Sequence, residues 1–341
     1  MMTNTRKWYS EIVLLHCVGM LMILFAHIAH ANGYMNVGEL LITGVPLFLF
    51  VSGFLVGVKP VPHNTVWLAR KTKRILVPYY ILLIAVLILY LILQTEPFQI
   101  KQWIILFSDL QGLTNFLFYN DLTGYYSPLA QGIGHFWFVT IIMLCYLLVP
   151  LFEKVCEFGF WKKHTSAIVV TTIIILQPIL IFYNVQISAI VVFFLGYLYA
   201  KNGVEMTGKR FISMTLAMIL LFGCRLIMRN YLDGTIIYNH YIATLSNYAI
   251  GLWIVALFFY LRIRMPKIID GIASWKFVLW LESIIYEIYL VHHIIIKGSW
   301  SLYQFGYNTV LTTVVVIAAT ICISLALKYA TAFVTSRIFK K

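Results

Sequence analysis

The chain of 341 residues is 62% hydrophobic and only 11% charged, and its mean hydropathy of +0.89 lies far outside the range of ordinary soluble domains. This composition excludes a water-soluble enzyme and predicts an all-α, polytopic integral membrane protein. The formal net charge of +13 is explained by membrane insertion polarity and by anionic lipid. No nucleic-acid-binding motif accompanies the charge, so we expect membrane lipids as partners and no nucleic acid.

Windows of about 20 apolar residues predict ten membrane-spanning helices. In chain order they cover residues 10–31, 40–58, 75–94, 136–152, 165–183, 187–200, 211–230, 242–261, 276–297 and 308–336. With the N-terminus inside, twenty of the 25 basic residues fall on cytoplasmic segments, as the positive-inside rule requires. We therefore expect one transmembrane domain over residues 1–341, in the cell membrane, with both termini cytoplasmic.

The first predicted span carries two histidines, His16 and His27, eleven residues apart. That spacing is about three helical turns, or roughly 16 Å, so both rings project from one face, and His30 follows one turn beyond His27. An ionisable group at that depth is costly and by default marks a functional site. The alternative is a purely structural role, in which a neutral imidazole hydrogen-bonds a neighbouring helix.

The second span and the segment after it supply two further features. Gly53 and Gly57 form a face of small residues, which lets another helix approach closely. Four cations lie immediately before the third span: Arg70, Lys71, Lys73 and Arg74. They are either ordinary topology-setting charges or a cradle for a phosphorylated cofactor, because clustered Arg and Lys pair well with phosphate oxygens.

The longest polar excursion covers residues 95–134 and is expected to be external. It is too short for a soluble domain. Its aromatic, Asn and Asp side chains suit stacking on and hydrogen bonding to a sugar, or else they form an interfacial aromatic belt. Tyr125, His135 and Trp137 lie in or beside this segment, where an external acceptor could dock.

Ionisable residues in the later spans predict a polar interior. Arg225 is expected to pair with Glu282 or Glu287, and His292 and His293 follow in the same ninth span. Such pairs would serve packing as well as chemistry. The five cysteines are scattered without a Cys-x-x-Cys pair, so neither a disulfide framework nor a metal site is expected.

Five stretches carry a resemblance to a known family. They are the first span ending in His27, residues 45–57 with their Phe-Ser-Gly core, the basic run into Pro78-Tyr79, His135-Phe136-Trp137-Phe138 leading to Pro150, and Ile288-Tyr289-Leu290-Val291-His292. In this order and spacing they resemble the acyltransferase 3 family of membrane-bound O-acyltransferases over nearly the whole chain. Such families typically have a first-span arginine, ten intervening residues and then a histidine taken to be catalytic. Here His27 takes the histidine position.

The chain departs from the family pattern at two places. His16 occupies the arginine position, and it is either protonated through a nearby carboxylate such as Glu11 or the role of the arginine has moved elsewhere. The family's Arg-x-x-Arg is approximated by Lys71-Thr72-Lys73-Arg74. Lysine keeps the charge but loses the bidentate fork.

The resemblance implies transfer of an acyl group from cytoplasmic acyl-CoA, as co-substrate, to a hydroxyl of a cell-surface or lipid-linked carbohydrate. The expected acyl group is acetyl, carried by acetyl-CoA, and no metal is expected. His27 would act as general base or carry the acyl group covalently. His16 would line the path of the donor. The phosphates of the donor would be bound by Arg70, Lys71, Lys73 and Arg74. The acceptor would be bound by Trp137, His135, Tyr125, Glu287 and His292.

Two other functions fit the same residues. A polysaccharide or lipid-linked sugar exporter would use the histidines as proton relay or substrate ligands. A membrane scaffold would use the polar side chains only to satisfy one another. Binding of acyl-CoA discriminates between these functions and acyl transfer, because an exporter has no reason to recognise coenzyme A.

Overall fold

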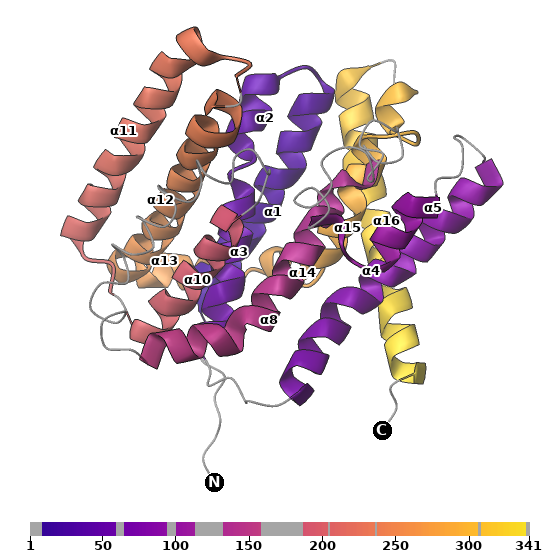
Figure 1. Cartoon of the computed structure of the whole chain (residues 1–341), viewed down its shortest axis with the longest axis horizontal. Helices are drawn as coiled ribbons and strands as arrows, with labels where there is room; N and C mark the ends of the chain where they lie inside the picture. Colours follow the sequence, from indigo (N-terminus) through magenta and orange to yellow (C-terminus); the bar gives the residue numbers. More distant parts are fainter. Residues whose placement is uncertain are drawn as a thin grey trace.

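The computed structural model describes residues 9–58, 65–93, 100–112, 132–157, 187–203, 205–235, 237–305 and 308–338. Within these ranges every regular element is a helix (Figure 1). Seven of the helices are long and apolar enough to cross a membrane. The prediction of an all-α, multi-pass membrane protein is therefore confirmed.

The seven long helical segments follow the predicted spans closely. They are α1 (Ser10–Ala31), α2 (Met35–Leu41) with α3 (Gly44–Gly57), α4 (Thr65–Leu93), η1 (Gly134–Phe136) with α8 (Trp137–Glu157), α11 (Gly208–Leu232), α12 (Ala243–Arg264) and α16 (Thr309–Ile338). Shorter elements between them are α5 (Ile100–Phe107), α10 (Ile187–Asn202), the π-helix η3 (Ile237–Ile242), α13 (Pro266–Ala273) and η4 (Leu302–Gln304). The predicted span 165–183 lies outside the described residues, as does most of the segment 95–134.

The predicted span 276–297 is not one continuous helix. It consists of α14 (Lys276–Glu282) and α15 (Ile285–Ile296), which meet at an angle of 69°. The Ser283 hydroxyl donates to the carbonyl of Trp280 at 2.7 Å, and such local side-chain bonds compete with helix continuation. The Lys328 ammonium in turn donates to the Ser283 hydroxyl at 2.8 Å. The Trp280 carbonyl and the Ser283 hydroxyl at the break therefore find hydrogen-bond partners within the protein.

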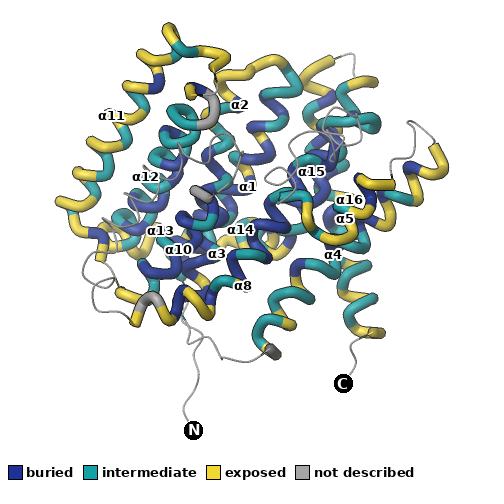
Figure 2. Tube along the Cα trace, in the orientation of Figure 1, coloured by how far each residue is buried: buried dark blue, intermediate teal, exposed yellow. Residues whose placement is uncertain are grey.

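The centre of the molecule is built on α1 and α3. Figure 2 shows their buried residues in the middle of the bundle, with exposed residues on the peripheral helices. The predicted small-residue face lies against α10: a Cβ on Gly53 would come within 1.9 Å of the Phe193 carbonyl, and one on Gly57 within 2.4 Å of the Tyr197 carbonyl. These glycines thus permit the close helix contact that the sequence indicates.

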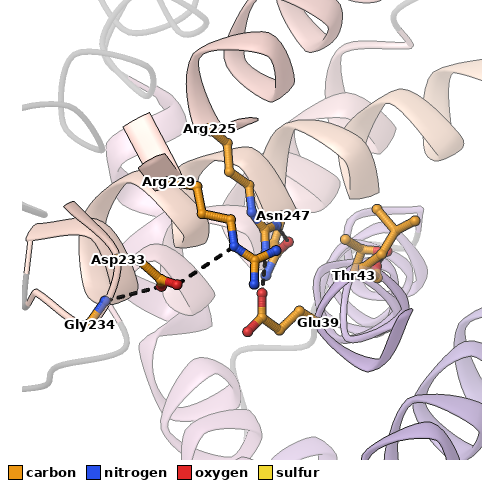
Figure 3. A network of polar contacts seen from close by, with 8 residues as sticks. Glu39, Thr43, Arg225, Arg229, Asp233, Gly234 and Asn247 are labelled. Atoms are coloured by element: carbon orange, nitrogen blue, oxygen red, sulfur yellow. Dashed lines mark hydrogen bonds and ion pairs between the residues drawn. The ribbon is translucent and has the colours of Figure 1, made fainter. Parts of the chain in front are cut away.

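The peripheral helix α11 is exposed along most of its apolar length but buries one charged residue, Arg225. Its guanidinium donates to Asn247 Oδ1 at 2.6 Å and to the carboxylate of Glu39 at 2.9 Å (Figure 3). The expected pairing of Arg225 with Glu282 or Glu287 is therefore wrong. Because Asn247 lies on α12 and Glu39 on α2, Arg225 ties the peripheral helix to both elements.

We expect Arg225→Leu to lower the free energy of unfolding by about 1–3 kcal/mol, because hydrogen bonds to a buried charged group are lost on both sides. The matched control is Arg229→Leu, one turn away on the same helix. Arg229 pairs with Asp233 at 3.8 Å in an exposed i,i+4 arrangement, which is worth about 0.3–0.5 kcal/mol. Thermal unfolding of the two detergent-solubilised variants measures the difference; equal unfolding temperatures would contradict the anchoring role of Arg225.

Candidate active site

Four histidine rings from three separate elements meet beside α1. His27 comes from α1, His135 from η1, and His292 and His293 from α15. The ring centroid of His27 lies 5.3 Å from that of His292 and 4.5 Å from that of His293. The centroid of His135 lies 5.2 Å and 4.8 Å from the same two rings. We refer to these four residues as the histidine cluster.

Both histidines of α15 can reach the cluster because α15 packs against α1 and also against η1. Successive side chains of a helix point about 100° apart, so one residue pair can face two neighbours. Two hydrogen bonds hold η1 on α15. The Tyr289 hydroxyl donates to the backbone carbonyl of His135, and Nε2 of His135 donates to the Leu290 carbonyl at 3.0 Å.

Backbone carbonyls select the protonated nitrogen in three rings of the cluster. Nδ1 of His292 lies 3.0 Å from the Ile288 oxygen and 2.7 Å from the Tyr289 oxygen. Nδ1 of His293 lies 3.0 Å from the Gly132 oxygen. A carbonyl only accepts, so these nitrogens donate and the opposite nitrogen of each neutral ring is an acceptor. By the same reasoning His135 donates from Nε2 and keeps Nδ1 as an acceptor.

Three nitrogens of the cluster are buried without a hydrogen-bond partner among the described residues: Nδ1 of His27, Nδ1 of His135 and Nε2 of His292. Two of these are acceptors by the assignment above. Buried polar atoms are normally hydrogen-bonded, so unpaired acceptors at one place fit a ligand that donates hydrogen bonds, such as an alcohol. In the described part of the chain, no group of three or more His, Cys, Asp and Glu has an arrangement suited to a metal ion.

His16 lies at the opposite end of the histidine face of α1. Its Nδ1 is 3.0 Å from the carboxylate of Glu282, the last residue of α14, and its ring packs against Phe48. The neighbouring carboxylate is therefore Glu282 and not the expected Glu11, which pairs with Arg262 at 3.5 Å. The two α1 histidines contact the bent α14–α15 pair on either side of its break, which confirms that they share one face.

The contact with Glu282 leads to a prediction for the position at which the family has arginine. His16→Arg should keep activity within about threefold, because a permanently charged guanidinium can pair with the same carboxylate. His16→Leu should lose more, since it leaves Glu282 without its partner. Transfer rates of the two variants measure this. An inactive but folded His16→Arg protein would show that the position needs an imidazole.

The four cations of the basic run lie near the start of α4 and are partly or fully exposed. The Lys71 ammonium lies 5.9 Å from the ring centroid of Trp67 and 5.2 Å from that of Tyr146, within cation–π range. Arg70 and Arg74 are exposed, and Lys73 is partly buried.

Helix α15 connects the basic run with the histidine cluster. The Tyr286 hydroxyl donates to the carbonyl of Ile75 at 2.9 Å, so the first turn of α15 lies directly beside the residue that follows Arg74. His292 comes six residues after Tyr286, about 9 Å further along the helix axis. The part of α4 that carries the cations therefore lies beside the first turn of α15, and His292 lies further along α15.

The structure separates the predicted acceptor residues into different groups. His135 and His292 lie in the histidine cluster. Glu287 lies in the first turn of α15. Trp137 begins α8 two residues after His135 and is partly buried against Phe138. Tyr125 lies outside the described residues.

The sequence indicates that His293 is an intramembrane histidine but does not assign it to the site. Of the histidine rings that contact His27, the ring of His293 is nevertheless the nearest. Adjacency to His292 was the available signal, and it was insufficient because consecutive helical residues usually face different neighbours.

A family model described as an acyltransferase domain matches residues 9–329, which is nearly the whole chain. No curated protein and no solved structure matches the chain significantly. The matched region contains all four members of the histidine cluster and the complete basic run. The chain therefore belongs to this acyltransferase family, whose general chemistry is the transfer of acyl groups.

Proposed function

We propose that the protein transfers an acyl group from cytoplasmic acyl-CoA to a hydroxyl of a cell-surface or lipid-linked carbohydrate. Acetyl is the acyl group that we propose. The observation that carries this proposal is the histidine cluster, in which the acceptor Nδ1 of His135 is buried without a hydrogen-bond partner among the described residues. A site of this kind suits a hydroxyl, which both donates a hydrogen bond and supplies the nucleophilic oxygen.

A sugar hydroxyl is a poor nucleophile at neutral pH, so its proton must be removed as the new bond forms. His27 has the position for this role, because it projects from α1 into the cluster and contacts two further histidines. We favour His27 as the general base. An acyl-histidine intermediate is the second route that the same ring allows.

The basic run supports a phosphorylated donor. The exposed Arg70 and Arg74 flank a Lys71 that is held over two aromatic rings, and guanidinium and ammonium groups pair strongly with phosphate oxygens. Coenzyme A carries phosphates at one end and the thioester at the other. In our proposal its phosphates lie at the start of α4 and its thioester reaches along α15 to the cluster.

We assign the two sides of the membrane from the distribution of charge. Twenty of 25 basic residues lie on the segments that we assign to the cytoplasm, including the basic run. In this orientation both termini are cytoplasmic, and the C-terminal end of α1, with His27 near it, faces the external half of the membrane.

Purified protein in lipid nanodiscs, supplied with radiolabelled acetyl-CoA and a panel of soluble and lipid-linked carbohydrates, tests the proposal. We expect release of free coenzyme A coupled to labelled ester on a carbohydrate. Labelled ester on a carbohydrate from propionyl- or succinyl-CoA alone would keep the reaction and change the acyl group. Absence of both acyl-CoA binding and transfer, together with carbohydrate transport in proteoliposomes, would favour the exporter.

A further inference from the structure

We propose that His292 is a positioning residue for His27: it accepts a hydrogen bond from Nδ1–H of His27 and thereby leaves Nε2 of His27 as the base. This inference rests on the proposed function for its catalytic meaning. Its structural content, the tautomer of one ring, can be measured without any transfer reaction.

The orientation of the His292 ring is fixed by its own helix. Its side chain is completely buried, and its Nδ1 donates to carbonyls of the preceding turn of its own helix. This places the proton on Nδ1 and leaves Nε2 as an acceptor, which is buried and unpaired among the described residues. His292 is therefore an acceptor held in place by its own backbone.

His27 carries the nitrogen that can pair with this acceptor. Its Nδ1 is also buried and has no hydrogen-bond partner in the described part of the chain, and its ring centroid is 5.3 Å from that of His292 with an interplanar angle of 40°. At this separation facing ring nitrogens can come within a hydrogen-bond distance of about 3 Å after a small rotation. One bond from Nδ1–H of His27 to Nε2 of His292 would then satisfy both atoms.

The other rings of the cluster suit this role less well. His293 is nearer to His27, but its ring stands at 89° to that of His27 in an edge-to-face contact, and its Nδ1 is engaged with Gly132. His135 contacts His292 and His293 through its ring. His292 thus combines an unpaired acceptor with a tilted ring contact to His27.

In the transfer step, His27 takes a proton from the acceptor and passes it to the leaving group. The acceptor O–H bond breaks and its proton moves to Nε2 of His27, while the oxygen forms a bond to the acyl carbon. As the C–S bond breaks, that proton moves to the leaving thiolate. Nδ1–H of His27 remains in place and donates to His292 throughout, which stabilises the transient imidazolium.

Two substitutions of His292 separate positioning from packing. His292→Leu removes the acceptor and should lower kcat by about 10²-fold while leaving KM for acyl-CoA unchanged. His292→Gln offers an amide oxygen near the position of Nε2 and should recover kcat to within about tenfold of the wild type. Gln and Leu variants with equally low kcat would indicate a packing role and overturn the proposal.

A double substitution adds a test for action through His27. Residues that act as one unit are strongly non-additive, so His27→Ala with His292→Leu should be no slower than His27→Ala alone. A further loss in the double variant would mean that His292 acts on the substrate independently of His27.

The decisive readout is the tautomer of His27, from ¹⁵N spectra of histidine-labelled protein with His27→Ala used for assignment. We expect Nδ1–H in the wild type and in His292→Gln, and a mixture of tautomers in His292→Leu. An unchanged tautomer in His292→Leu would overturn the proposal. Because this measurement needs no substrate, it decides the role of His292 even if the wild type transfers no acyl group.

Discussion

Replacement of His27 by alanine should lower the rate of acyl transfer by about 10²–10⁴-fold, because that is the usual contribution of a positioned general base. The ring projects from α1 into the histidine cluster, so its removal leaves the helix itself and its apolar contacts in place. Expression and acyl-CoA binding should therefore be retained. The rate is measured with purified protein, and donor binding by equilibrium titration with labelled acyl-CoA.

The matched control is His30→Ala on the same helix. Its ring lies 6.3 Å from that of His27, farther than the rings of His292 and His293, so near wild-type transfer is expected. A His27→Ala protein that acylates at the wild-type rate would rule out both the base and the covalent role. The catalytic assignment would then move to His292 or His135.

Replacement of Lys71 and Arg74 by alanine should weaken acyl-CoA binding about 10²-fold or more, since each charge-assisted contact is worth about 1.5–3 kcal/mol. Lys71 is held near the rings of Trp67 and Tyr146, and Arg74 is exposed beside the residue that contacts α15. The affinity of the double variant is measured by titration, with solubilised yield as a check on membrane insertion.

The control for the basic run removes two cations elsewhere, Lys209 and Arg264. Lys209 lies in the first turn of α11, and Arg264 ends α12 against the ring of Tyr260. This change in net charge equals that of the Lys71 and Arg74 variant, so it should leave affinity unchanged. If both double variants bind acyl-CoA within about threefold of the wild type, the basic run serves topology alone.

The local pattern of the sequence was sufficient for most of the long helices and for the histidine face of α1. Apolar windows fix where a helix can cross a membrane, and the eleven-residue spacing fixes the relative direction of His16 and His27. The same windows could not show the break between α14 and α15. Apolar content is the same in a straight and a bent segment, and Ser283 at the break bonds to Trp280 and to the distant Lys328.

Local sequence patterns could not identify side-chain partners that are far apart in the chain. Glu282 is 266 residues from His16, and Glu39 is 186 residues from Arg225, so helix packing alone decides these pairs. The histidine cluster also depends on helix packing. The sequence indicates His27, His135 and His292 separately, whereas their meeting with His293 depends on the packing of α15 against both α1 and η1.

The most direct measurement of the central claim is a cryo-electron microscopy structure with a non-hydrolysable acyl-CoA analogue. The account predicts the phosphates beside Lys71 and Arg74, and the acyl carbon within about 6 Å of the His27 ring, which leaves space for one hydroxyl oxygen between base and carbon. An analogue whose acyl end lies away from the histidine cluster would contradict the account.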